Sequence, residues 1–131
     1  MKTRFAEKVK ELIGKQKESD EKKIQSSIEY IVSTPSLART ITLIRDYIKE
    51  TKRKCFTYNS IKSYASRTGF YKEYTDRTLD RSIRKLASMG VLYRTKYSKD
   101  KRIVFFCPTK IFYTVLRRLM VVENDNSVSN M

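Results

Sequence analysis

The stretch TDRTLDRSIRKLASMGVLYRTKYSKDKRIVFF, residues 75–106, contains two patterns that decide the fold. Its first half places apolar residues at helical spacing, at Leu79, Ile83 and Leu86. Thr75 stands where an N-cap is preferred, and Gly90 stands where a left-handed residue ends a helix. Its second half has two runs rich in β-branched and aromatic residues around the polar turn SKDK. The stretch therefore predicts a helix over about 76–89 and a β-hairpin over about 91–107.

Two further helices are predicted upstream of this stretch. The first runs from an N-cap at Ser36 to about Lys52, with a stripe at Leu37, Ile41, Ile44 and Ile48. The second follows Thr57 as its N-cap and ends at Gly69, with inward residues Ile61, Tyr64 and Ala65. Between them, Cys55 and Phe56 form a short extended link.

The two ends of the chain predict additional helices. Apolar residues at helical spacing occur within 3–18 and again at Ile24, Ile28 and Ile31, before Pro35 interrupts the pattern. After Pro108, a last helix has a wide apolar face formed by Ile111, Phe112, Val115, Leu116 and Leu119. The expected organisation is an N-terminal helical extension (1–35), a domain with a C-terminal helix (36–122) and a polar, disordered tail (123–131).

The order helix, extended link, helix, turn, helix and basic hairpin resembles a winged helix-turn-helix domain over about 36–109. The resemblance is carried by SLARTITLIRDYIKE, by FTYNSIKSYASRTG and by T-x-x-T-L-x-x-x-I-x-x-L-x-x-x-G-V-L-Y, which begins at Thr75. It implies a mainly α fold with a small β-hairpin wing, here with extra N- and C-terminal helices. Small regulators of archaea and of their viruses or plasmids are similar in type.

The charge of the chain points to a polyanionic partner. The 131 residues carry 29 Lys or Arg against 14 Asp or Glu, a formal charge of +15. Residues 36–122 hold 21 of these basic residues and 6 of the acidic ones, so the whole excess lies in the predicted domain. A compact domain with this excess repels itself unless it binds a polyanion, for which nucleic acid is the first candidate.

Composition excludes most catalytic chemistry. The chain has no His, only two Cys and only three Gly, which rules out imidazole catalysis, a four-Cys zinc site and glycine-rich phosphate loops. A nuclease would need Mg²⁺, and the carboxylates that could hold it are Asp76, Asp80 and Glu73, with no second carboxylate cluster beside them. We therefore expect no enzyme activity, no metal and no cofactor.

No apolar run approaches the roughly 20 residues that cross a bilayer, and the N-terminus has no hydrophobic signal segment. We expect a cytoplasmic protein without a membrane partner, located in the host cell if its source is viral.

The helix 76–89 presents basic residues opposite its apolar stripe. Stepping 100° per residue places Arg77, Arg81, Arg84 and Lys85 on the outward face. A helix fits the major groove of B-DNA, where residues near its N-terminal end reach base edges. Arg77, Thr78 and Arg81 are thus predicted to read sequence, and Arg84 and Lys85 to contact phosphates.

Two other regions are predicted to contact the DNA backbone. The hairpin carries Lys96, Lys99, Lys101 and Arg102 at or beside its tip. These side chains suit phosphates or the neighbouring minor groove, although lysines also protect exposed strand edges. Tyr58 and Asn59 begin the helix after Thr57, where backbone N–H groups can hold a phosphate unless Thr57 is only a cap.

These observations predict a duplex-DNA-binding transcriptional regulator. A replication or partition factor of the same fold is one alternative, and a basic module that docks RNA or an acidic protein is another. Because one recognition helix reads only a few base pairs, a homodimer is expected. Its interface is either the helices within 3–33 or the helix after Pro108.

In the winged fold, the link between the first two helices commonly pairs with the second wing strand. The resemblance therefore places Cys55 near Cys107 and makes a disulfide conceivable. Cytoplasmic thiols are usually reduced outside hyperthermophiles, so the sequence favours two free cysteines.

Overall fold

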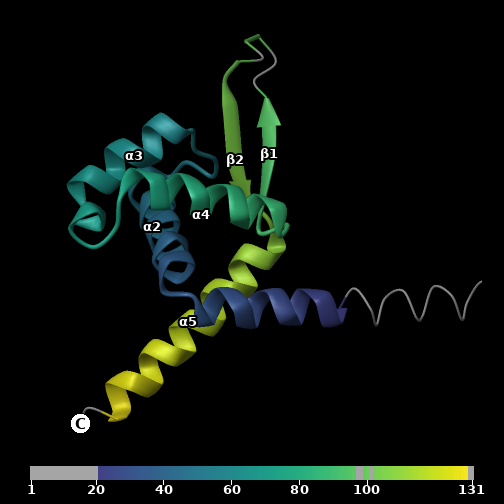
Figure 1. The fold of residues 1–131 in the computed structure, drawn as a ribbon, viewed down its shortest axis with the longest axis vertical. Coiled ribbons are helices and arrows are strands. Elements are labelled where there is room, and N and C mark those ends of the chain that lie inside the picture. The colour runs from purple at the N-terminus through teal and green to yellow at the C-terminus, as the bar shows by residue number, and fades with distance from the viewer. Residues whose placement is uncertain (1–20, 97–98, 101, 130–131) are drawn as a thin grey trace, which may run out of the picture.

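The computed structural model describes residues 21–96, 99–100 and 102–129, with side chains as far as Val121 (Figure 1). A helix over residues 21–33 comes first. It is followed by α2 (Pro35–Thr51), α3 (Tyr58–Arg67), a 3-10 turn η1 (Phe70–Lys72), α4 (Asp76–Ser88), β1 (Leu92–Lys96), β2 (Val104–Pro108) and α5 (Lys110–Ser129). This confirms the predicted mainly helical fold with one β-hairpin. The helix predicted within 3–18 lies outside the described residues.

The start of α2 differs from the prediction. Its N-cap is Thr34, two residues before the expected Ser36, and Pro35 occupies the first turn. Proline is favoured there because the first N–H groups of a helix need no intrahelical acceptor. The Thr34 hydroxyl instead donates to the carbonyl of Tyr30 at 2.6 Å, which satisfies the end of the preceding helix.

Threonine caps fix the starts of α3 and α4 as predicted. The Thr57 side chain accepts a hydrogen bond from the backbone of Ser60 at 3.2 Å, and the Ser60 hydroxyl in turn accepts one from the Thr57 backbone at 2.9 Å. Thr75 accepts from the Thr78 backbone at 3.2 Å. Gly69 follows α3 with φ of 80° and permits the turn into η1, because glycine tolerates this left-handed backbone.

The hairpin is antiparallel, with register from Leu92 opposite Pro108 to Lys96 opposite Val104. Phe56 adds a one-residue bridge to β2, exchanging hydrogen bonds with Phe106 at 3.0 and 2.8 Å. This confirms the pairing that the winged fold implied for the link.

The two cysteines are joined, contrary to the preference for free thiols. The Phe56–Phe106 bridge aligns the neighbouring residues, and Cys55 forms a disulfide with Cys107 across a Cα–Cα distance of 4.4 Å. The resemblance had placed the two cysteines near each other, and the preference for free thiols rested on the usual cytoplasmic redox state, which gave the wrong expectation.

One apolar core joins the helices and the hairpin. The α4 residues Leu79, Ile83 and Leu86 are fully buried, as the periodicity predicted. They pack in a cluster that includes Ile41 and Ile44 of α2. Within α2 and α4, residues that the helical stripes did not include, such as Thr40, Leu43 and Ser82, are also buried. Burial of its inner face fixes which side of α4 remains outside.

Helix α5 leads away from the hairpin and passes beside the helix of residues 21–33 (Figure 1). Arg118 of α5 contacts Glu29 of that helix at 3.4 Å. The helix continues to Ser129, so the sequence-based end at residue 122 was wrong. No glycine or proline follows Lys110, and polar residues alone do not end a helix.

Candidate nucleic-acid interface

The outward face of α4 carries three arginines. Arg77, Arg81 and Arg84 are all exposed, on the side opposite the buried stripe. Within the described part of the chain, Arg77 and Arg81 have no ion-pair or hydrogen-bond partner. Arg84 pairs with Asp80 one turn earlier at 3.4 Å, yet 75% of its side chain remains exposed. The arginine face predicted from the sequence is thus present and accessible.

Two other residues of α4 are engaged within the chain. The Thr78 hydroxyl lies 3.1 Å from that of Thr75, which makes Thr78 part of the cap. The Lys85 ammonium lies 5.7 Å from the centre of the Tyr30 ring, a distance at which a cation interacts favourably with an aromatic face. Lys85 is therefore held against the N-terminal helix, whereas the three arginines are not.

The start of α3 is tied to α4. The Tyr58 hydroxyl donates to the backbone carbonyl of Asp80 at 2.8 Å. Burial, with a further contribution from the Asp80 carboxylate, raises the pKa of Tyr58 above its ordinary value, so the phenol stays protonated and remains a donor. Asn59 is exposed. Of the two residues predicted to hold a phosphate, only Asn59 keeps its side chain free for one.

The first turn of α4 has a similar tie. The Tyr71 hydroxyl of η1 donates to the Asp76 carboxylate, and burial together with this bond raises the pKa of Tyr71. A carboxylate at this position also interacts favourably with the positive end of the helix dipole. Asp76 thus orients the start of the helix.

The hairpin presents basic residues on both sides of its tip. Lys96, Lys99 and Arg102 are exposed, and Lys101 lies outside the described residues. Arg102 turns to Asp100, with its Nε 3.2 Å from the carboxylate. The hairpin extends beyond the helical body (Figure 1), so its exposed cations are accessible to an extended polyanion.

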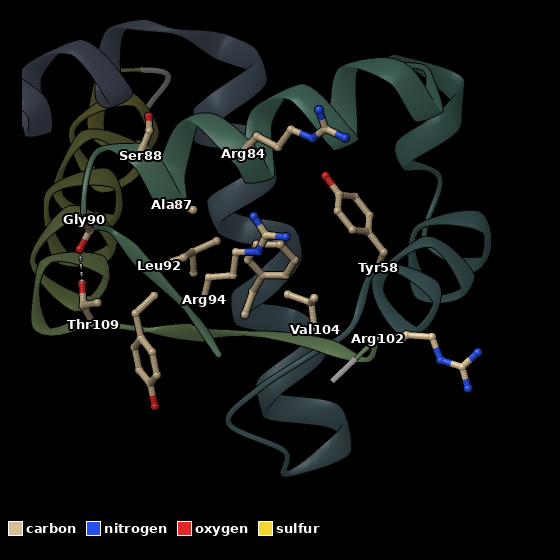
Figure 2. A pocket seen from close by; sticks show the side chains of 12 residues that line it. Tyr58, Arg84, Ala87, Ser88, Gly90, Leu92, Arg94, Arg102, Val104 and Thr109 are labelled. Atoms are coloured by element: carbon tan, nitrogen blue, oxygen red, sulfur yellow. Dashed lines mark hydrogen bonds between the residues drawn. The ribbon is translucent and has the colours of Figure 1, made fainter. Parts of the chain in front are cut away.

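A hollow of about 1060 Å³ separates the second half of α4 from the hairpin (Figure 2). Arg84, Arg94 and Arg102 line it together with Tyr58. Arg94 was not among the residues predicted to bind DNA. The alternation of side chains along a strand could have identified Arg94. Residues two apart lie on the same face, so Arg94 shares with the buried Leu92 the face that turns toward α4.

The described residues contain neither a cluster of metal ligands nor a membrane-spanning helix. No three acidic or cysteine side chains in this part of the chain gather as metal ligands would, and Asp76 and Asp80 are engaged as described above. None of the helices that the structure describes is both long and apolar enough to span a bilayer.

Comparison with known proteins identifies the domain. Residues 58–110 match the family model described as "Winged helix DNA-binding domain". Nothing among the curated proteins matches the chain. The chain therefore contains a winged helix-turn-helix domain, as its sequence resemblance implied, and described helices precede and follow the matched residues.

Solved structures share this fold over most of the chain. The S. aureus MepR–DNA complex is 14% identical, with a TM-score of 0.53 over 91% of this chain and 87% of that one. Bordetella bronchiseptica BpsR, whose DNA binding is regulated by 6-hydroxynicotinic acid, is 9% identical, with a TM-score of 0.52 over 91% and 83% of the two chains. At these identities the likeness shows the winged-helix fold.

Proposed function

We propose that this protein binds duplex DNA and acts as a transcriptional regulator. The observation that carries the proposal is the exposed arginine face of α4, which comprises Arg77, Arg81 and Arg84 and is held outward by the buried Leu79, Ile83 and Leu86. In the winged fold this helix enters the major groove. The match to a DNA-binding family and the DNA complex of a protein with the same fold support the proposal.

Each part of the surface has a proposed role. Arg77, Thr78 and Arg81 lie in the first half of α4 and read base edges, where an arginine can bond guanine at two atoms. Phosphate contacts come from Arg84, Asn59, Lys96, Lys99, Lys101 and Arg102. Lys85, Tyr58 and Thr78 are engaged inside the chain, so their contribution to DNA binding is smaller than that of the arginines.

The protein is proposed to act as a homodimer. Apolar side chains that a monomer leaves open lie on both terminal helices: Ile24 is 38% exposed, Met120 47% and Val121 50%. A dimer doubles the number of base pairs read and favours a palindromic site.

Selection from random duplex oligonucleotides tests the function. We expect an enriched motif with two related half-sites and an affinity that falls steeply with salt, by about 0.9 log units per neutralised phosphate for each tenfold increase. Enrichment of a motif that occurs as a repeated array at an origin would favour a replication or partition factor. Absence of duplex binding, with binding to RNA or to acidic protein, would refute the proposal.

A further inference from the structure

The hollow between α4 and the hairpin combines apolar lining residues with basic ones, unlike the rest of the basic surface. Its floor is apolar, formed by Leu92, Val104 and Phe106. Phe106 is buried and packs edge-on against the Tyr58 ring, with centroids 5.5 Å apart. An apolar floor excludes water, which strengthens the attraction between an anion and the cations at the rim.

Two guanidinium groups border this floor. Figure 2 shows Arg84 reaching the opening from α4 and Arg94 reaching it from β1, whereas the guanidinium of Arg102 points away. Arg94 is exposed and has no ion-pair partner among the described residues. No acidic residue lines the hollow. Asp80 and Asp100 contact Arg84 and Arg102 without lining the hollow, so the opening keeps the unpaired charge of Arg94 and a net positive charge.

Arg84 is positioned by contacts on two elements. The Tyr58 hydroxyl of α3 donates to the backbone carbonyl of Asp80. The Asp80 carboxylate in turn lies 3.4 Å from Nε of Arg84. This contact uses Nε and leaves the terminal N–H groups of the guanidinium for another acceptor. Asp80 thus restricts the orientation of Arg84 without occupying its remaining donors.

We propose that Arg84 and Arg94 together bind a single backbone phosphate of duplex DNA in this hollow, with Asp80 as the residue that positions Arg84. The inference rests on the proposed DNA-binding function. A strand that borders the groove entered by α4 must pass between this helix and the hairpin, and a phosphate lying there meets donors from both sides. Guanidinium forks suit phosphate because several N–H groups lie in one plane.

The salt dependence of binding to random duplex DNA tests the shared phosphate. We compare the wild-type protein with Arg84→Ala, Arg94→Ala and the double variant, and with Arg117→Ala, an exposed arginine of α5, as the control matched in charge. The double variant is expected to reduce the log–log slope by about 0.9, the value for one phosphate, with each single variant reducing it by no more. Arg117→Ala is expected to leave the slope unchanged.

The possible outcomes separate the site from the function. A reduction of about 1.8 in the double variant would mean two separate phosphates, and an unchanged slope would mean none; either overturns the shared site while DNA binding stands. A wild-type protein that does not bind duplex DNA overturns the function and the site together. Circular dichroism and thermal unfolding of each variant verify that the fold is kept.

Asp80→Asn tests positioning separately, because it preserves the backbone carbonyl that Tyr58 uses. If Asp80 positions Arg84, the affinity lost on Arg84→Ala is expected to be about threefold smaller in the Asp80→Asn background, since coupled residues are not additive. If Asp80 acts only through its negative charge, binding becomes tighter in Asp80→Asn and the loss caused by Arg84→Ala stays the same. That second result refutes the positioning role.

Discussion

Cys55 and Cys107 are bonded to each other one residue away from the Phe56–Phe106 bridge, so the covalent link and the backbone pairing fasten the same two segments. The two cysteines are separated by 52 positions in the sequence. The segment between them contains α3, α4 and β1, and therefore the whole proposed recognition unit. The disulfide closes a loop around the part of the domain that we propose contacts DNA.

This closure predicts a large stability difference. A loop of about 50 residues restricts the unfolded chain by about 4 kcal/mol in the chain-entropy treatment, and measured values for disulfides are commonly about 2–4 kcal/mol. We expect the Cys55→Ser, Cys107→Ser double variant to lose free energy of unfolding in this range in urea. Wild-type protein treated with dithiothreitol is the matched control and is expected to fall to the same value. Equal stability before and after reduction would contradict this prediction.

Local sequence rules predicted the elements well because the signals are local. Thr57 and Thr75 cap the helices that follow them, and the spacing of Leu79, Ile83 and Leu86 identified the buried face of α4. Where two local signals competed, the prediction was wrong by a few residues. Ser36 was a plausible cap, yet Pro35 suits the first turn and moves the cap to Thr34.

Features that depend on contacts between residues far apart in the sequence could not be predicted from local patterns. The state of the cysteines depends on a bridge between residues 50 positions apart. Lys85 has the same helical pattern as the arginines, but Tyr30 from a distant helix lies beneath it. Arg94 was overlooked because the cluster of cations at the hairpin tip is the stronger sequence pattern. The importance of Arg94 comes from strand alternation and from the position of α4 across the hollow.

The division between base-reading and phosphate-binding residues predicts different losses for two exposed cations. Arg81→Ala is expected to weaken binding to the selected site by about 1–3 kcal/mol and to relax sequence preference at one position. Lys99→Ala is expected to weaken selected and random duplexes by similar amounts, since a phosphate contact carries no sequence information. Fluorescence anisotropy on both duplexes measures the four affinities. Equal losses for the two variants on both duplexes would show that the roles are assigned wrongly.

Tyr58 predicts a stability difference that depends on pH. Tyr58→Phe removes the hydrogen bond to the Asp80 carbonyl, a loss of about 1 kcal/mol near neutral pH. The pKa of Tyr58 is raised in the folded state, so this contribution is fully present below the unfolded pKa of about 10 and declines as the pH rises further. The difference between wild type and variant is therefore expected to shrink above pH 10.

Urea unfolding at pH 8 and pH 11 measures this difference. Tyr64, whose pKa is raised to about 12 by burial and by Glu50, is present in both proteins, and its own loss of stability at high pH cancels in the comparison. Tyr93→Phe, at a ring that is 52% exposed, is the control and is expected to have little effect at either pH. A difference for Tyr58→Phe that grows between pH 8 and pH 11 would contradict a raised pKa of Tyr58 in the folded state.

If the protein is a dimer, a negative charge introduced on the terminal helix that forms the interface is expected to dissociate it. Met120→Glu places a carboxylate on exposed apolar surface of α5, and Ile24→Glu does the same on the helix of residues 21–33. A buried unpaired charge is costly, so the variant at the interface is expected to become monomeric in light scattering at micromolar concentration while keeping its thermal stability as a monomer. Thr114→Glu, at an exposed polar position of α5, adds the same single negative charge and is the control for charge alone. Because half-sites are read by two recognition helices, loss of the dimer is also expected to weaken binding to a palindromic duplex far more than to a single half-site.

A wild-type protein that is monomeric under these conditions would contradict the proposed dimer. The selected motif would then be expected to be short and without symmetry, because one recognition helix reads only a few base pairs.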